Sequence, residues 1–184
     1  MTTIKREKYT ALQRVRRLIL GKNKPNLATR ISVGIGFLIW VYLASWQILT
    51  FLALTLMSSL AQYEDLKNAF NRVGNKLYHY EGNTLELLTL HNIVQLVAYL
   101  IVLIALILIY RRKRIGFLIY IFGNVSIILS TLLIMKMKYF QYEMSYLYVI
   151  LIGSTTLYFG IGALWFYRWK PKKEEENSFT PEEV

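Results

Sequence analysis

The chain of 184 residues contains no cysteine, which excludes structural disulfides, thiolate metal sites and catalysis by a thiol. It also contains four long apolar runs without Lys, Arg, Asp or Glu, at about 31–57, 93–110, 115–135 and 146–167. Transporters and intramembrane enzymes usually place an ionisable side chain in the membrane, where its cost is accepted for function. The missing charges argue against a proton-coupled exporter or an aspartyl peptidase, and the missing cysteines against a disulfide generator.

These four runs have the length of membrane-spanning helices. A helix of about 18 to 27 residues is roughly 27–40 Å long, and the hydrocarbon core of a bilayer is about 30 Å thick. Hydrophobic residues make up 55% of the chain and aromatic residues 15%, more than a soluble domain of this size contains. The sequence therefore predicts an all-α membrane protein with a four-helix transmembrane domain over residues 31–167.

Basic residues gather on one side of this predicted bundle. Residues 1–30 hold nine of the 22 Lys and Arg, the turn Arg111–Arg114 holds four, and the tail from Arg168 holds four more. Cytoplasmic loops are enriched in Lys and Arg, so both termini of this multi-pass protein are expected in the cytoplasm. The distribution favours attraction to an anionic bilayer, and no nucleic acid partner is expected.

Residues 3–20 predict an amphipathic helix, with apolar side chains on one face and arginines on the other. Such a helix lies along the headgroups of the membrane, or docks to an acidic surface of a cytoplasmic partner. The basic residues expected at this interface, or at a docking surface, are Arg14, Arg16, Arg17, Arg111, Arg112, Lys113 and Arg114.

The segment 58–90 is the only sizeable part predicted on the far side of the membrane. Apolar residues repeat every three or four positions from Leu60 to Leu77, which predicts an amphipathic helix. Asn83 followed by Glu86 resembles a cap that begins the next helix near Thr84. The segment is too short for a core of its own, so it rests on the bilayer, the bundle or another protein. The tail 168–184, charged and without apolar periodicity, is expected to be disordered.

Uncharged polar residues are spread through the apolar runs. Gln47 and Gln95 lie at matching depths by residue counting, so we expect them to face the bundle interior and each other. Hydrogen bonds between helices explain such residues, and a pocket for a lipid, quinone or peptide segment is the alternative. The predicted polar layer of the bundle consists of Gln47, His91, Gln95, Tyr99, Asn124 and Thr155.

Small residues spaced four apart predict close contact between helix backbones, either inside this bundle or with a partner's transmembrane helix. The candidate helix-packing residues are Ser32, Gly36, Ser126, Ser130, Thr156 and Gly160. Aromatic residues near the ends of the runs, among them Tyr139, Tyr146 and Tyr148, are expected in interfacial belts.

The stretch Leu90–Met135, which includes IYRRKRIGFLIYIFGNVSIILS, resembles small bacterial four-helix inner-membrane proteins of unassigned function. In these proteins a Lys/Arg turn followed by Gly-Phe and a LYIxG-like segment recurs. The resemblance covers about a quarter of the chain. It implies the fold and a bacterial inner membrane, and it assigns no functional residue.

The sequence predicts a non-catalytic accessory or scaffold subunit of an inner-membrane complex, whose partners are other membrane protein subunits. The alternative is a small oligomeric carrier or channel that uses the uncharged polar layer, and a membrane enzyme acting on lipid is third. No catalytic residue, cofactor or metal is expected. His79 and His91 are twelve residues apart and lack metal-ligand spacing.

Overall fold

The computed structural model describes residues 25, 27–60, 63–80, 82–143 and 146–168. Its elements are α2 (Leu27–Ser58), α3 (Tyr63–Val73), the π-helical turn η1 (Gly74–Tyr78), α4 (Thr84–Tyr110), α5 (Ile115–Glu143) and α6 (Tyr146–Arg168). Within these ranges every regular element is helical. The predicted amphipathic helix with Arg14, Arg16 and Arg17, and the predicted disordered tail beyond Arg168, lie outside the described residues.

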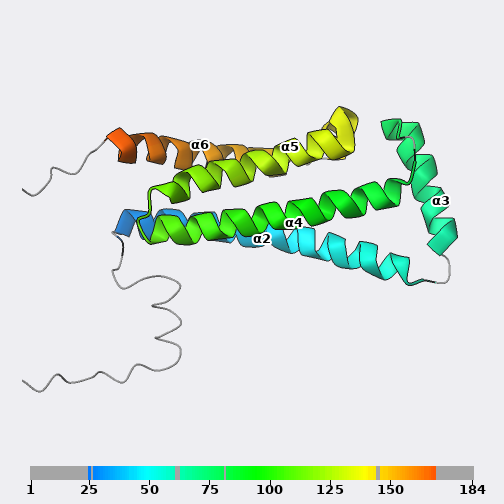
Figure 1. Ribbon diagram of the computed structural model, residues 1–184, viewed down its shortest axis with the longest axis horizontal. Coiled ribbons are helices and arrows are strands. Elements are labelled where there is room, and N and C mark those ends of the chain that lie inside the picture. Colours follow the sequence, from blue (N-terminus) through cyan, green and yellow to red (C-terminus); the bar gives the residue numbers. More distant parts are fainter. Residues whose placement is uncertain (1–24, 26, 61–62, 81, 144–145, 169–184) are drawn as a thin grey trace, which may run out of the picture.

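Four of the helices are long and apolar enough to cross a membrane, over Leu27–Met57, Thr84–Tyr110, Ile115–Gln141 and Tyr146–Leu164. They lie along the long axis of the molecule, and α3 lies across one end (Figure 1). We call this the α3 end, and the opposite one, where α4 turns into α5, the Arg111–Arg114 end. The all-α architecture of a small multi-pass membrane protein thus agrees with the four apolar runs.

The hairpin of α4 and α5 forms the centre of the bundle, with α2 against α4 and α6 against α5. Ala105, Leu106, Ile127 and Ile152 are almost completely buried between these helices. The hairpin is tight because Gly116 follows the turn: a Cβ at Gly116 would lie 2.8 Å from the main-chain nitrogen of Ile109.

The α3 end differs from its prediction in detail. The predicted helix continues past Val73 as the π-helical turn η1, and α4 already begins at Thr84, so the predicted external segment 58–90 includes the first two turns of a spanning helix. The start near Thr84 is as predicted, but the cap is not. Asn83 makes no side-chain cap, and the main-chain N–H of Thr84 donates to Oδ1 of Asn71 at 2.8 Å.

Asn71 caps α4 in place of Asn83 because η1 approaches α4 closely. A Cβ at Gly74 would lie 2.8 Å from Cγ2 of Thr84, closer than atoms can approach without displacement. The missing side chain therefore lets α3 and η1 settle onto the first turn of α4, where Asn71 can reach its free N–H group. Asn83 instead donates from Nδ2 to Glu86 at 2.5 Å.

The helix α5 breaks at Lys136, which has φ 59° and ψ 168°. The predicted apolar run ends at the preceding residue, Met135. The aromatic rings of Tyr78 and Tyr80 pack with Met135 in a second buried cluster at the α3 end, and Nζ of Lys136 lies 5.9 Å from the centre of the Tyr80 ring. Through this cluster the η1 segment packs against α5 at its break.

Candidate functional site

Gln95 is the centre of a buried polar cluster between α4, α5 and α6. Its side chain is 1% exposed. Nε2 of this residue lies 2.9 Å from the carbonyl oxygen of Ile127, 2.9 Å from Oγ1 of Thr131 and 3.2 Å from Oγ of Ser130. Both hydroxyl groups also lie 3.0 Å from the Ile127 carbonyl and donate to it. One carboxamide therefore binds a whole polar turn of α5 to α4.

The hydrogen bonds on the other side of Gln95 have a definite direction. Its Oε1 accepts from the hydroxyl of Tyr148 in α6 at 3.2 Å. A phenol has one proton, so Tyr148 must accept from Tyr99, whose hydroxyl lies 2.6 Å away. The chain of donation runs from Tyr99 in α4 through Tyr148 in α6 back to Gln95, and it joins three helices.

His91 connects this polar cluster to the aromatic cluster at the α3 end. Its Nε2 lies 3.2 Å from Nε2 of Gln95 and 3.1 Å from Oγ1 of Thr131. The donor at each contact depends on the tautomer of the imidazole: Nε2 accepts from Gln95 when the ring proton is on Nδ1, and it donates to Thr131 when the proton is on Nε2. On its other side the ring meets Tyr139 edge to face, with 6.0 Å between the centroids.

The structure divides the predicted polar layer into two parts. Asn124 and Thr155 are buried, and the side chain of Tyr120 interacts with both of them. Tyr99, a member of the same predicted layer, bonds to Tyr148 instead. A side chain on a helix leans toward the N-terminus of that helix, so the Tyr99 hydroxyl lies nearer to Gln95 than its Cα position indicates.

Gln47 is buried in α2, but no hydrogen bond joins it to Gln95 within the described residues. The Trp40 indole donates to the carbonyl oxygen of Tyr99 at 2.8 Å and fixes the register of α2 against α4. Two turns further along this antiparallel pair, Gln47 comes level with Asn92. Asn92 is 2% exposed, and its Oδ1 has no hydrogen-bond partner among the residues that the structure describes.

The first pair of small residues lies at a contact between α2 and α6 inside the bundle. The Ser32 hydroxyl donates to Ala28 O at 2.9 Å, so it accepts from the Tyr158 hydroxyl at 2.5 Å. Gly36 faces Phe159, since a Cβ here would lie 3.1 Å from the ring. Both residues serve contacts within this chain.

The other two pairs are used unevenly. Ser130 belongs to the Gln95 cluster, whereas Ser126 donates to the carbonyl of its own helix at 2.8 Å. Thr156 likewise donates within α6, at 2.6 Å. A Cβ at Gly160 would lie 3.9 Å from Cδ1 of Ile121, an ordinary contact with α5. Only half of each pair therefore faces a neighbouring helix of this chain.

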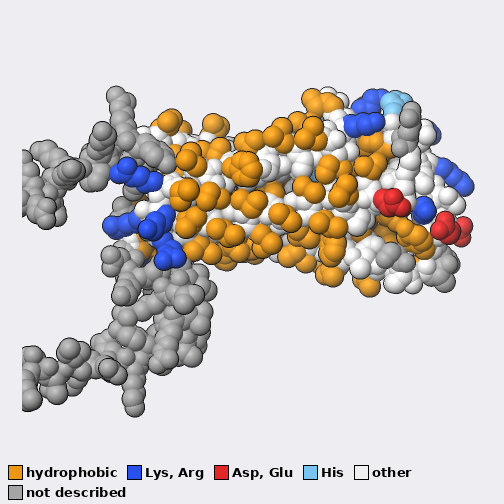
Figure 2. Space-filling model, viewed as in Figure 1, with side chains coloured by type: hydrophobic (Ala, Val, Ile, Leu, Met, Phe, Trp, Pro, Cys, Tyr) orange, Lys and Arg blue, Asp and Glu red, His pale blue; other side chains and the backbone are white. Residues whose placement is uncertain are grey.

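Charged side chains lie at the two ends of the bundle, and apolar side chains cover its flank (Figure 2). Arg111, Arg112, Lys113 and Arg114 are all exposed in the α4–α5 turn. Arg112 has a left-handed φ of 58°, which lets the chain reverse within four residues. Among the described residues, no group of three His, Asp or Glu side chains is placed to hold a metal ion.

Two members of the Gln95 cluster were missed by sequence reasoning. Thr131 follows Asn124 by two helical turns, so the periodicity of the buried face could have found it. Tyr148 was assigned to an interfacial belt, which is the usual place of tyrosine near a helix end. No signal in a single sequence distinguishes that position from a hydrogen bond inside the bundle.

No family model, curated protein or solved structure matches this chain. The comparisons therefore assign no family, and the resemblance of Leu90–Met135 to small bacterial membrane proteins stays a prediction.

Proposed function

We propose that this protein is a non-catalytic accessory or scaffold subunit of a membrane protein complex. The observation that carries the proposal is a contrast between the buried polar groups of the bundle, which bond to one another, and the apolar side chains exposed on its outer helices. The central polar groups around Gln95 are occupied by one another, and they hold α4, α5 and α6 together. The helices α2 and α6, in contrast, expose large apolar side chains, such as Trp46 at 67% and Leu157 at 69%.

Two glycines on the outer helices favour a protein partner at part of this surface. A side chain at Gly34 in α2 or at Gly153 in α6 would meet no atom within 4 Å. Small residues on an outward face let the backbone of a second transmembrane helix approach closely. Lipid covers the remainder of the apolar flank. The basic N-terminal segment and the Arg111–Arg114 turn supply a second surface, for anionic lipid or for an acidic partner.

We further propose a bacterial inner membrane as the location, with both termini in the cytoplasm. This orientation is supported by the uneven distribution of Lys and Arg along the sequence. The segment with α3 then lies on the outer side of that membrane.

The second candidate is a small oligomeric carrier or channel. Its specific support is the buried, unpartnered Oδ1 of Asn92, since an unsatisfied polar atom in a membrane bundle calls for an explanation. A second copy or a bound solute could supply the missing donor only after the bundle opens, because Asn92 is 2% exposed.

Photo-crosslinking in native membranes separates the two candidates. A photoreactive residue replaces Trp46 or Leu157 on the exposed faces, and Ile127 in the buried core serves as the matched control. A discrete adduct with a different protein, in a fixed ratio and absent from the control, supports the scaffold. Adducts containing only this chain favour the carrier, and adducts with lipid alone contradict the scaffold proposal.

The basic N-terminal segment has its own test. Replacing Arg14, Arg16 and Arg17 with Glu leaves the Arg111–Arg114 turn to maintain insertion. If the segment docks a partner, the chain still inserts but the companion is lost on co-purification in mild detergent. Retention of the companion by the triple variant would remove docking from the role of this segment.

A further inference from the structure

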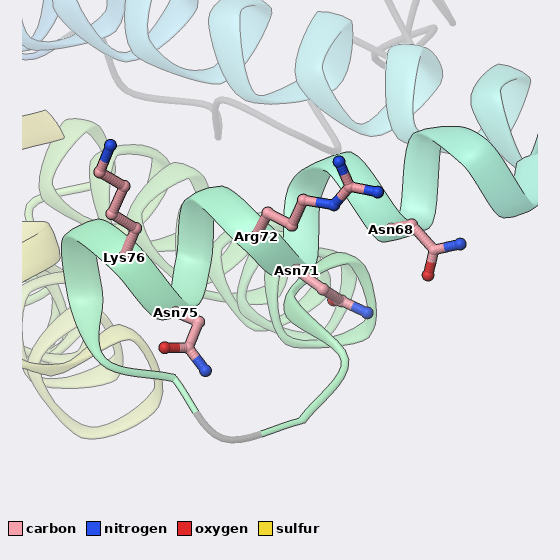
Figure 3. A pocket seen from close by; sticks show the side chains of 5 residues that line it. All are labelled: Asn68, Asn71, Arg72, Asn75 and Lys76. Carbon is pink, nitrogen blue, oxygen red and sulfur yellow. The ribbon is translucent and has the colours of Figure 1, made fainter.

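Five polar side chains line a shallow, open hollow on the outer surface of α3 and η1: Asn68, Asn71, Arg72, Asn75 and Lys76. Figure 3 shows Arg72 and Lys76 extending along one edge of this surface and the three asparagines along the other. The spacing of three and four residues brings all five onto neighbouring turns of one helix face. The hollow is remote from the Gln95 cluster and from the apolar flank, so neither of the functions proposed above uses it.

The orientation of the Asn71 carboxamide is fixed by the fold. Its Oδ1 accepts the main-chain N–H of Thr84 at 2.8 Å and so caps α4. Its Nδ2 must therefore present two N–H donors away from that bond. The position of the helix under it is equally fixed, because Gly74 lies against Thr84 with no room for a side chain. The hollow thus has at least one donor group, the Asn71 amide, that the fold orients before a ligand binds.

The two cations of the hollow are not neutralised within the described residues. Neither Arg72 nor Lys76 makes an ion pair there, and no hydrogen bond occupies the side chains of Asn68 or Asn75. Among the described residues, the carboxylates of Glu64 and Asp65 lie in the first turn of α3 and outside the hollow. A guanidinium, an ammonium and a carboxamide held with its donors outward all suit the same ligand, an anion with several oxygen atoms.

The π-helical turn contributes to this arrangement. Its wider turn rotates Asn75 and Lys76 relative to the helical positions that would follow α3, and such turns are frequent at functional sites. In addition, α3 lies across the end of the bundle where α2 ends and α4 begins (Figure 1). In a bilayer that these helices span, this end lies near one face of the membrane. Phosphate groups of lipids occupy that level.

We propose that the surface formed by Asn68, Asn71, Arg72, Asn75 and Lys76 binds a phosphate ester. Arg72 and Lys76 hold the phosphate oxygens, Asn71 donates to them from Nδ2, and Asn68 and Asn75 hydrogen-bond to hydroxyl groups of the esterified alcohol. Either a lipid headgroup or a soluble phosphate ester has this chemistry, and glycerol phosphate is the group that phosphatidylglycerol shares with its soluble counterpart.

The test uses the full chain in a maltoside detergent, which contains no phosphorus. Glycerol phosphate is titrated in one arm by calorimetry, and phosphatidylglycerol is added in the other and followed by native mass spectrometry. Saturable binding is expected, and Arg72→Gln with Lys76→Gln should weaken it by about ten-fold or more because two charge-assisted contacts are lost. Binding in the first arm identifies a soluble ester, and binding in the second arm alone identifies a lipid.

Two further variants make the test specific. Lys67→Gln with Lys138→Gln removes the same charge outside the hollow and should change the affinity by less than about two-fold. Asn71→Asp keeps an oxygen for the Thr84 N–H group but replaces the two donors with negative charge, so it should abolish binding while the thermal stability is retained. Absence of saturable binding in both arms, or equal weakening by the two double variants, overturns the proposal.

Discussion

The hydroxyl of Tyr80 donates a hydrogen bond to the main-chain carbonyl of Met135, the last residue before α5 breaks at Lys136. Tyr80 is 2% exposed and Met135 is fully buried. A helix that breaks leaves carbonyl groups without their usual donors, and burial would make such a group costly. The segment between η1 and α4 therefore supplies a donor where α5 lacks one, and the break and the segment stabilise each other.

Replacing Tyr80 with Phe tests this relationship. The ring and its contacts stay, and only the hydrogen bond to the buried Met135 carbonyl is lost. We expect the free energy of unfolding to fall by about 1–2 kcal/mol, measured by titration of mixed micelles with a denaturing detergent. Tyr42→Phe is the control, because that side chain is exposed on α2, and it should change the stability by less than about 0.5 kcal/mol. Equal effects of the two variants would contradict the role of Tyr80.

The same tyrosine predicts a loss of stability at high pH. Burial, and in second place the neighbouring Tyr139, raise the pKa of Tyr80 from 10.0 to about 12. The stabilising contribution of the neutral phenol is complete below pH 10, decreases as the pH rises from 10 to about 12, and is absent above that. The stability difference between the native chain and the Tyr80→Phe variant should therefore shrink across this window. A stability difference between the two proteins that stays constant up to pH 12 would refute the predicted titration of Tyr80.

The contact of Gly74 with Thr84 gives an independent test of how the α3 end is attached. In Gly74→Ala the new methyl group would lie 2.8 Å from Cγ2 of Thr84, and the free energy of unfolding should fall by about 1–3 kcal/mol. Adding Thr84→Ala removes that methyl group and the hydroxyl but keeps the N–H bonded to Asn71. The double variant should recover much of the loss, which a double-mutant cycle measures.

Gly34→Ala is the matched control for this cycle. That glycine lies inside α2, where an added side chain meets nothing within 4 Å, so the substitution should be neutral or stabilising by about 0.5–1 kcal/mol. If Gly74→Ala were equally harmless, the close approach of η1 to α4 would be wrong.

The spanning helices could be predicted because one physical requirement, a long stretch without charge, determines them. The structure of the α3 end could not be predicted in this way, because it depends on contacts between separate segments of the chain. Asn83 and Glu86 have the spacing of a cap, yet Asn71, twelve positions earlier, provides it. Nothing in the local sequence shows that a missing side chain at Gly74 would bring Asn71 within reach.

The polar residues illustrate the same limit within the bundle. The spacing of His91, Gln95 and Tyr99 predicts one stripe on α4, and the hydrogen bond between His91 and Gln95 lies along that stripe. Their partners on other helices were not predictable from depth. Counting residues locates Cα atoms, whereas a tyrosine hydroxyl lies more than a helical turn away from its own Cα. Counting residues matches Gln47 with Gln95 in depth, but the register of α2 against α4 brings Gln47 level with Asn92, and the contacts of Gln95 to other helices run to α5 and α6.

The proposed orientation predicts the location of reporter fusions. Reporters inserted at Arg112 or attached after Val184 should be active in the cytoplasm, and one inserted at Asn83 should be active on the opposite side. Replacing the four basic residues Arg111–Arg114 with Gln should reduce the fraction of correctly inserted chains, because the α4–α5 turn then loses its positive charge. A reporter after Val184 that is active outside the cell would exclude an even number of spans with a cytoplasmic N-terminus.

The direction of donation from Tyr99 through Tyr148 to Gln95 makes the two tyrosines unequal. Tyr99→Phe removes one hydrogen bond, the one to Tyr148, whereas Tyr148→Phe removes that bond and the one to Gln95. Hydrogen bonds between helices in a bilayer contribute about 0.6 kcal/mol on average. We therefore expect the free energy of unfolding to fall by roughly 0.6 kcal/mol in the first variant and about twice as much in the second. In the background of Gln95→Leu, the bond from Tyr148 to Gln95 is already gone, so the two phenylalanine substitutions should cost the same. An equal cost in the native background, or a larger cost for Tyr99→Phe, would show that the protons are arranged in another way.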